Sequence, residues 1–211
     1  MLPSWVTFCT IGDHAVFLDI RNNRYCALPA ATAIQLTSSK PRLTPAVEQR
    51  LARLGWLKHA GDGETASSHV IPTMELAPAE TVERPRIGTV LGIAAVIAAT
   101  KLAVATAPFE RVLGAVSGEN VRAVAMNAAH PLNDIIARFE TIERVVIGRD
   151  ACLLRSLSLH RLLARAGHPT TLVFGVKLHP FEAHCWLQQG DLVLNDTLEQ
   201  TGLFTAIRSV Q

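Results

Sequence analysis

The sequence has little charge and few aromatic side chains. Of its 211 residues, 18% are charged and 5% are aromatic, whereas 49% are hydrophobic. So many apolar residues with so little charge exclude a largely disordered chain, and the length suits one or two domains with a buried core. The net charge of +2 excludes a strongly basic nucleic-acid-binding protein, so we expect no nucleic-acid partner.

Cysteine is also scarce. The four cysteines are too few for a disulfide scaffold, and none of them form the C-x-x-C pair that is typical of zinc sites: Cys9, Cys26, Cys152 and Cys185. A phosphate-binding loop is missing as well, because Gly61-Asp62-Gly63 matches no nucleotide motif. We therefore expect a cytoplasmic protein that uses no cofactor and no metal.

Long hydrophobic runs are missing too. The first residues lack a basic stretch followed by an apolar run, so they do not resemble a secretory signal. Residues 87–100 are apolar but stop at Lys101, short of the roughly 20 residues that a membrane span needs. We expect a buried core helix in this region rather than a membrane span, and the sequence leaves open whether the helix touches a membrane.

The residues that are present divide the chain into three parts. Residues 1–60 carry three strand-like runs, at 5–9, 15–20 and 25–28, which are separated by Gly12-Asp13 and by Asn22-Asn23, a pair suited to a tight hairpin. Helical patterns follow at 31–37 and 45–57, the second beginning with Thr44 as N-cap. Residues 61–86 lose this periodicity and are expected to be a linker.

Residues 87–211 are expected to form a second domain of the α+β class. Helical patterns dominate at 87–107, 135–139 and 151–166, and Gly167 is placed to end the last helix. Strand-like runs follow at 171–176, 184–187 and 192–194. Helices followed by an antiparallel sheet are typical of α+β folds.

Cys152 is the first candidate for chemistry. It stands at the second position of a helix that Asp150 would cap, where the helix dipole stabilises a thiolate, and Arg149 and Arg155 lie nearby in sequence. The alternative is a small buried hydrophobic residue, which is the usual role of a lone cysteine among leucines. His160, two turns further along the same helix, is expected at the surface.

His184 and Asp196 extend this candidate to a triad. They flank a predicted hairpin around Gly190. Their side chains point to the same face of the hairpin only if the residue numbers of each cross-strand pair add up to an even number, and this requires an odd-numbered loop or a bulge. In that arrangement Cys152 attacks a carbonyl carbon, His184 acts as general base and then general acid, and Asp196 orients the imidazole. Each residue alone also has an ordinary structural explanation.

The ordered combination of these segments resembles a known family. Arg149–Leu157, the strand Leu172–Val176, Phe181-x-x-His184-x-Trp186 and Leu194-Asn195-Asp196 together look like the transglutaminase-like maturation peptidases of lasso-peptide biosynthesis, the B proteins. The resemblance covers residues 87–211. It implies a papain-like cysteine peptidase fold that removes the leader of a ribosomal precursor, with Cys152, His184 and Asp196 as nucleophile, base and orienting acid.

Residues 1–60 are similar to the PqqD-like precursor-recognition domain, a small winged helix-turn-helix. That resemblance implies capture of the leader peptide as an added strand at a sheet edge, with leader-binding residues at Phe17, Leu18, Tyr25 and Leu28. DNA binding is the competing use of this shape. Seven Lys and Arg residues against three acids give this part a net charge of +4, which suits an acidic peptide as well as phosphate.

The sequence therefore predicts a two-domain leader peptidase. The family resemblance further implies that the freed core peptide passes to an asparagine-synthetase-like lasso cyclase, the C protein. Two alternatives stay open: an acyltransferase on the same triad, in which an amine replaces water, and a non-catalytic peptide- or DNA-binding module.

Overall fold

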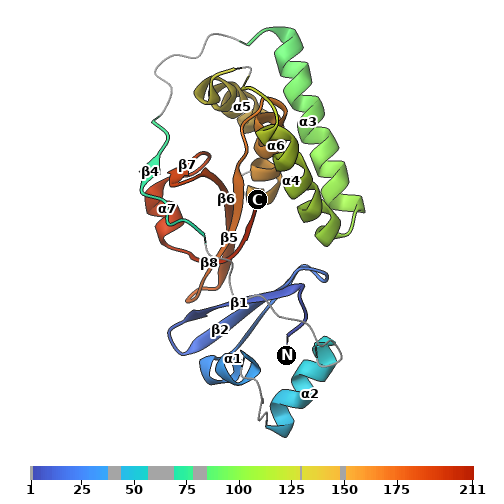
Figure 1. The fold of residues 1–211 in the computed structure, drawn as a ribbon, viewed down its shortest axis with the longest axis vertical. Coiled ribbons are helices and arrows are strands. Elements are labelled where there is room, and N and C mark those ends of the chain that lie inside the picture. Colours follow the sequence, from blue (N-terminus) through green and yellow to red (C-terminus); the bar gives the residue numbers. More distant parts are fainter. Residues whose placement is uncertain (1, 38–43, 57–68, 78–84, 129, 148–150) are drawn as a thin grey trace.

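The computed structural model describes residues 2–37, 44–56, 69–77, 85–128, 130–147 and 151–211. They form an α+β fold with two sheets (Figure 1). The first sheet is antiparallel, with three strands in the order β1-β2-β3, and is followed by two helices: β1 (Val6–Ile11), β2 (His14–Asp19), β3 (Arg24–Pro29), α1 (Ala30–Thr37) and α2 (Pro45–Leu54). Both predicted hairpins are present, and Asn23 adopts the positive φ that a tight turn needs.

The second sheet has five strands in the order β4-β7-β6-β5-β8. Its strands are β4 (Met74–Glu75), β5 (Thr171–Lys177), β6 (Glu182–Gln189), β7 (Leu192–Val193) and β8 (Thr205–Val210). Four long helices cover one side of it, and α7 (Leu198–Gly202) lies on the other (Figure 1). The long helices are α3 (Ile87–Thr106), α4 (Phe109–Val124), α5 (Leu132–Val146) and α6 (Cys152–Arg165).

Part of the expected linker belongs to this second sheet. The strand β4 pairs in parallel with β7, and the amide of Gln188 donates a hydrogen bond of 2.8 Å to the carbonyl of Val70. The side chain of Glu75 accepts a hydrogen bond from the backbone N–H of Leu198 at the start of α7. An edge strand with unpaired backbone groups is thereby covered. Residues 61–68 and 78–84 of the expected linker lie outside the described residues.

The central strand β2 contributes to two hydrophobic cores. Val16 and Leu18 point into the large core that the second sheet shares with α3–α6. Ala15 and Phe17 point to the opposite side, into a smaller core. That core is closed by α1, α2 and the indole of Trp56, which donates a hydrogen bond of 3.1 Å to the buried carboxylate of Asp19. The first sheet is therefore packed on both faces, and one of these faces fixes it against the second sheet.

The helix α6 runs through the centre of the second unit and contacts α3, α4, α5 and two strands of the sheet. Because α6 is surrounded, His160 is fully buried, and the prediction of a surface position for it is wrong. Its Nδ1 lies 2.8 Å from the hydroxyl of Thr170, and its Nε2 lies 3.2 Å from the carboxylate of Glu119. The hydrogen-bond partner on Nδ1 and the carboxylate near Nε2 make this buried position tolerable.

The helix α3 is only partly a core helix. Its buried side chains face the rest of the protein, whereas Ile87, Leu91 and Leu102 are exposed. Among the described residues it is the one helix long and apolar enough to cross a membrane, with a mean hydropathy of 2.0 in its most apolar window. A core helix of a soluble protein passes the same test, so this property alone assigns no membrane role.

Candidate active site

Cys152 is the first residue of α6. The N-cap is Ala151, whose side chain makes no capping hydrogen bond, so the prediction that Cys152 takes the second position is wrong by one residue. Asp150 and Arg149 lie outside the described residues. The thiol is half-buried, at the end of the helix where free N–H groups and the helix dipole favour negative charge. The N-terminal position of α6 therefore suits a thiolate.

His184 lies on β6, and Asp196 follows β7. The hairpin between these strands has the two-residue loop Gly190-Asp191, because Gln189 pairs with Leu192 and Gln188 with Val193. The expected condition, an odd-numbered loop or a bulge in the paired strands, is therefore not met, since this register gives odd sums. The two side chains nevertheless meet, and Nε2 of His184 is hydrogen-bonded to Oδ2 of Asp196. Regular pairing ends at Val193 and the chain bends, which frees Asp196 from strand alternation.

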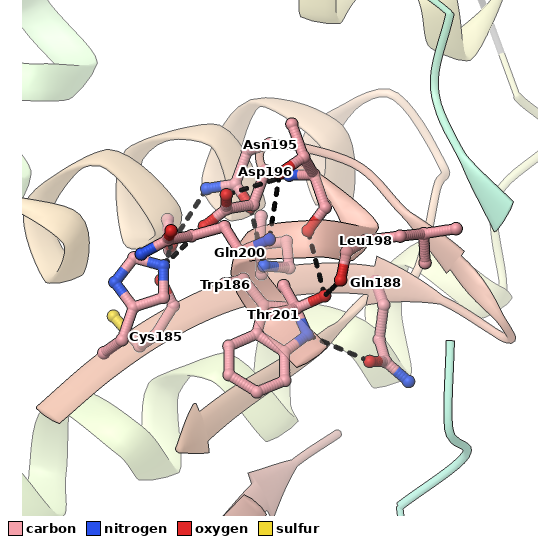
Figure 2. Close-up of polar contacts among 12 residues, drawn as sticks. Cys185, Trp186, Gln188, Asn195, Asp196, Leu198, Gln200 and Thr201 are labelled. Carbon is pink, nitrogen blue, oxygen red and sulfur yellow. Dashed lines mark hydrogen bonds and ion pairs between the residues drawn. The ribbon is translucent and has the colours of Figure 1, made fainter. Parts of the chain in front are cut away.

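Asn195 fixes this bend, and the sequence reasoning gave it no role. Its Oδ1 accepts a hydrogen bond of 2.8 Å from the backbone N–H of Leu187 on β6, and its amide donates one of 2.9 Å to the hydroxyl of Ser156 on α6. The second carboxylate oxygen of Asp196 accepts from the backbone N–H of Thr197. Figure 2 shows Asn195 and Asp196 above the strand that carries Trp186 and Gln188. A single sequence offers no signal for Asn195 beyond its place next to Asp196.

Two aromatic rings hold the imidazole of His184. The centroid of its ring lies 5.1 Å from that of Phe204 and 6.2 Å from that of Trp186. On the paired strand, Gly175 lies opposite His184. A Cβ at Gly175 would stand 2.8 Å from atoms of both aromatic side chains, so only glycine fits there without displacement. The orientation of the base thus depends on packing as well as on Asp196.

The charges of the site favour an ion pair. Hydrogen bonds from Cys185 and from His184 lower the pKa of the Cys152 thiol to about 4, although its partial burial acts in the opposite direction. Burial alone would lower the pKa of His184, but its hydrogen bonds to Asp196 and Cys152 outweigh this effect and raise it to about 9. Because Asp196 occupies Nε2, the Nδ1 nitrogen is left to face the thiol. Between these two pKa values the pair exists as thiolate and imidazolium.

Cys185 acts as a hydrogen-bond donor beside the nucleophile. It is buried, and its pKa is raised well above the ordinary thiol value by its hydrogen bond with Cys152 and by burial. It therefore keeps its proton while Cys152 loses one. The sequence reasoning placed the side chains of Cys185 and His184 on opposite faces of a strand, and the two residues do pack into different clusters. Both side chains nevertheless reach Cys152, which lies at the N-terminal end of α6.

The four predicted leader-binding residues lie in different environments. Phe17 and Leu18 are fully buried on the central strand β2, and Leu28 is 3% exposed. Their burial argues against direct contact between these side chains and a leader. Tyr25, on the outer strand β3, is half-buried, and its ring centroid lies 5.6 Å from that of Phe181. Burial raises the pKa of Tyr25, and the nearby thiols of Cys185 and Cys152 raise it further, so its hydroxyl lies close to the candidate active site.

The arrangement holds the groups that nucleophilic chemistry at a thiol uses. Throughout the described ranges, no cluster of three or more His, Cys, Asp or Glu residues is placed to hold a metal ion. A polarised thiol, a base on the adjacent strand and a carboxylate behind that base are the parts that acyl transfer from a carbonyl substrate needs.

Comparisons with known proteins agree with this chemistry. The microcin J25-processing protein McjB of Escherichia coli is 32% identical over 75 residues, and the aligned part covers 36% of this chain and 36% of that protein. No solved structure matches the chain significantly. Residues 92–209, more than half of the chain and the part that holds Cys152, His184 and Asp196, match the family model described as the transglutaminase-like superfamily. The chain therefore belongs to the transglutaminase-like superfamily.

Proposed function

We propose that this protein is a cytoplasmic cysteine peptidase that removes the leader from a lasso-peptide precursor. The observation that carries the proposal is the Cys152–His184–Asp196 arrangement, with its lowered thiol pKa and raised imidazole pKa. The similarity to a protein that processes microcin J25 supports the precursor class, over the 36% of each chain that aligns. Activity, substrate and partners of the whole protein are part of the proposal.

The proposed reaction begins with attack of the Cys152 thiolate on the carbonyl carbon of the scissile peptide bond. A tetrahedral oxyanion forms, for which the backbone N–H of Cys152 is our candidate donor, since the first N–H groups of a helix have no partner within it. The protonated His184 then transfers its proton to the amine nitrogen, and the C–N bond breaks. The amine leaves as the new N-terminus of the core peptide, and the leader remains as a thioester.

Water completes the cycle. Neutral His184 removes a proton from a water molecule, which attacks the thioester carbonyl, and the C–S bond breaks. The leader is released with a new carboxylate, while the thiolate and the imidazolium are restored. Asp196 keeps Nδ1 directed at the reacting atoms in both half-reactions, because its hydrogen bond fixes Nε2.

We assign leader recognition to the first unit, as a PqqD-like domain. Its strand β3 pairs with β2 on one side only among the described strands, so a peptide strand can be added at its other edge. Tyr25 on that strand lies near the thiol, which supports delivery of a bound leader to Cys152 at a raised effective concentration. The released core peptide would then pass to an asparagine-synthetase-like cyclase.

The test is mass spectrometry of a precursor peptide incubated with the wild-type protein and with C152A, each with and without the cyclase. We expect a leader fragment and a core fragment from the wild type and an intact precursor from the alanine variant. C26S serves as the matched control, since Cys26 is another half-buried thiol and packs against the smaller core, whereas Cys152 packs against the large one. Cleavage by both wild type and C152A, or by neither while the leader still binds, would contradict the proposal.

Acyl transfer to an amine is the second candidate, and the match to the transglutaminase-like superfamily favours it. Both reactions share the thioester and differ only in the group that attacks it. Adding a primary amine at high concentration to the same incubation separates them. A leader that carries the mass of the amide indicates acyl transfer, and a leader with a free carboxylate in the presence of the amine indicates hydrolysis.

A further inference from the structure

A cavity of about 430 Å³ adjoins the candidate triad and has no role in the proposed peptidase reaction. It lies between α5, the end of β4 and the bend at residues 194–197, and Asp196 forms part of its wall. Apolar side chains line much of it, and α5 adds the charged groups Glu140 and Arg144. A cleft that combines apolar walls with polar and charged groups is a common form of a binding site.

Glu140 is the unusual group in this cavity. Its carboxylate is half-buried, and burial raises its pKa. Its neighbour Glu143 has a partner, Arg155, at 2.8 Å. Arg144, one turn further along α5, is close enough to lower the pKa of Glu140 but forms no ion pair with it. In the part of the chain that the structure describes, no hydrogen bond or ion pair to the Glu140 carboxylate is present, and a half-buried carboxylate without a protein partner attracts a cation from outside.

The position of the cavity indicates which part of a substrate it receives. In the proposed peptidase reaction, His184 gives its proton to the amine nitrogen that leaves. The cavity borders Asp196, which holds the nitrogen of His184 that points away from Cys152. Cys152 and His184 do not line the cavity themselves. A peptide chain that continues from the leaving amine past the imidazole would reach it, whereas the acyl side of the substrate would stay on the side of Cys152.

We infer that the cavity binds the segment on the amine side of the scissile bond, and that Glu140 is a specificity-determining residue that binds a cationic amine in it. The inference rests on the proposed function. The bound cation can come from either of two sources. One is a Lys or Arg side chain of the substrate, and the other is the α-ammonium group that cleavage creates.

The test compares kcat/KM for peptides that carry Lys, Gln or Glu at each of the first positions after the scissile bond. We expect the wild type to prefer Lys over Glu by about tenfold at one position, the size of a partly buried charged contact. E140Q should abolish that preference, and E140K should reverse it. D134N is the matched control, because Asp134 lies exposed on the same helix and does not line the cavity. Lys-to-Glu ratios that stay within about twofold of wild type in both Glu140 variants would overturn the side-chain source.

Product inhibition tests whether the bound cation is the new α-ammonium group. If Glu140 binds the new α-ammonium group, the released peptide should inhibit the wild type about tenfold more strongly than its N-acetylated form, and E140Q should remove the difference. The inference as a whole is overturned if neither the Lys preference nor this difference depends on Glu140.

A binding measurement separates this inference from the proposed function. In the C152A background, E140Q should weaken binding of a Lys-containing precursor about tenfold, measured by fluorescence anisotropy of a labelled peptide. If no peptide is cleaved by the wild type but binding still depends on Glu140, the peptidase proposal fails and the cation site stands. If cleavage occurs and binding, peptide preference and product inhibition are all insensitive to Glu140, the peptidase stands and the cation site fails.

Discussion

The low pKa of the Cys152 thiol depends on two neighbours that can be removed separately. Hydrogen bonds from Cys185 and His184 lower this pKa from 9.0 to about 4. Replacing His184 with alanine removes the imidazolium, and replacing Cys185 with alanine removes a thiol donor, while Cys152 keeps its place at the start of α6. We therefore expect each variant to raise the pKa of Cys152 toward the ordinary thiol value.

The size of the effect follows from two opposing terms. At pH 6 a thiol with a pKa of about 4 is almost wholly thiolate, whereas one with a pKa of 9.0 is thiolate to about one part in 1000. A thiolate of lower pKa is also a weaker nucleophile, by about 100-fold over this range if the Brønsted coefficient is about 0.4–0.5. The wild type should therefore react about tenfold faster than a fully shifted variant at pH 6 and about 100-fold more slowly above pH 9.

The assay is reaction with an aromatic disulfide that releases a coloured thiol, followed from about pH 3 to pH 10 in a C26S background, because Cys26 is the other half-exposed thiol. The wild-type rate should rise near pH 4, stay level, and change again near pH 9, where the imidazolium of His184 loses its proton. C152A gives the background rate. A wild-type profile with a single rise between about pH 8 and pH 9 would refute the ion pair and the reasoning from hydrogen bonds.

Three further changes test other parts of the structure. D196N leaves an oxygen acceptor for His184 but removes the charge that helps to raise its pKa, so the alkaline limit of the pH–rate profile should move below about 9 and kcat/KM should fall about tenfold. G175A places a Cβ within 2.8 Å of the side chains that hold the imidazole and should lower the free energy of unfolding, measured in urea, by about 1–3 kcal/mol. G118A, in open space on α4, is its control and should raise the free energy of unfolding by about 0.5–1 kcal/mol. Equal effects of the two variants would contradict the packing argument. D19A leaves a buried indole N–H without its acceptor and should lower the free energy of unfolding by about 3 kcal/mol at neutral pH. The pKa of Asp19 is lowered in the fold, because hydrogen bonds outweigh the effect of burial. The difference in free energy of unfolding between D19A and wild type should therefore shrink as the pH falls below 3.8. A difference that stayed constant down to about pH 2 would contradict this assignment.

Local signals in the sequence were sufficient for many elements and for the choice of the three candidate residues. The Asn22-Asn23 turn, the end of α6 before Gly167 and the strand at 171–176 were predicted because turn chemistry and apolar periodicity act over a few residues. The family resemblance made Cys152 a more specific candidate for the nucleophile than its position at a helix start alone. It is the contact between His184 and Asp196, and not the register argument, that the structure confirms.

The prediction of the strand register was wrong because the register depends on contacts between distant residues, which no local sequence pattern indicates. The bend after Val193 exists because the side chain of Asn195 replaces a backbone partner for Leu187 and reaches Ser156 on α6. Strands β4 and β8 were missed for a similar reason: their pairing depends on segments distant in sequence. Phe17 and Leu18 were predicted to contact a leader, although the unbroken apolar run in β2 is typical of a strand buried on both faces.

The burial of β2 on both faces bears on how a tethered substrate would reach the thiol. Because Val16 and Leu18 belong to the same core as the helices around Cys152, separating the two units would expose that core, which opposes free hinge motion. The contact between Tyr25 and Phe181 adds a second fixed point at the edge strand β3. If β3 holds the leader, the distance from the bound segment to the thiol is set by the fold, and the gain in effective concentration depends on the length of peptide between the two. The proposed peptidase would then select its cleavage site by that spacing together with the cavity on the amine side, so that neither alone needs to provide the whole specificity.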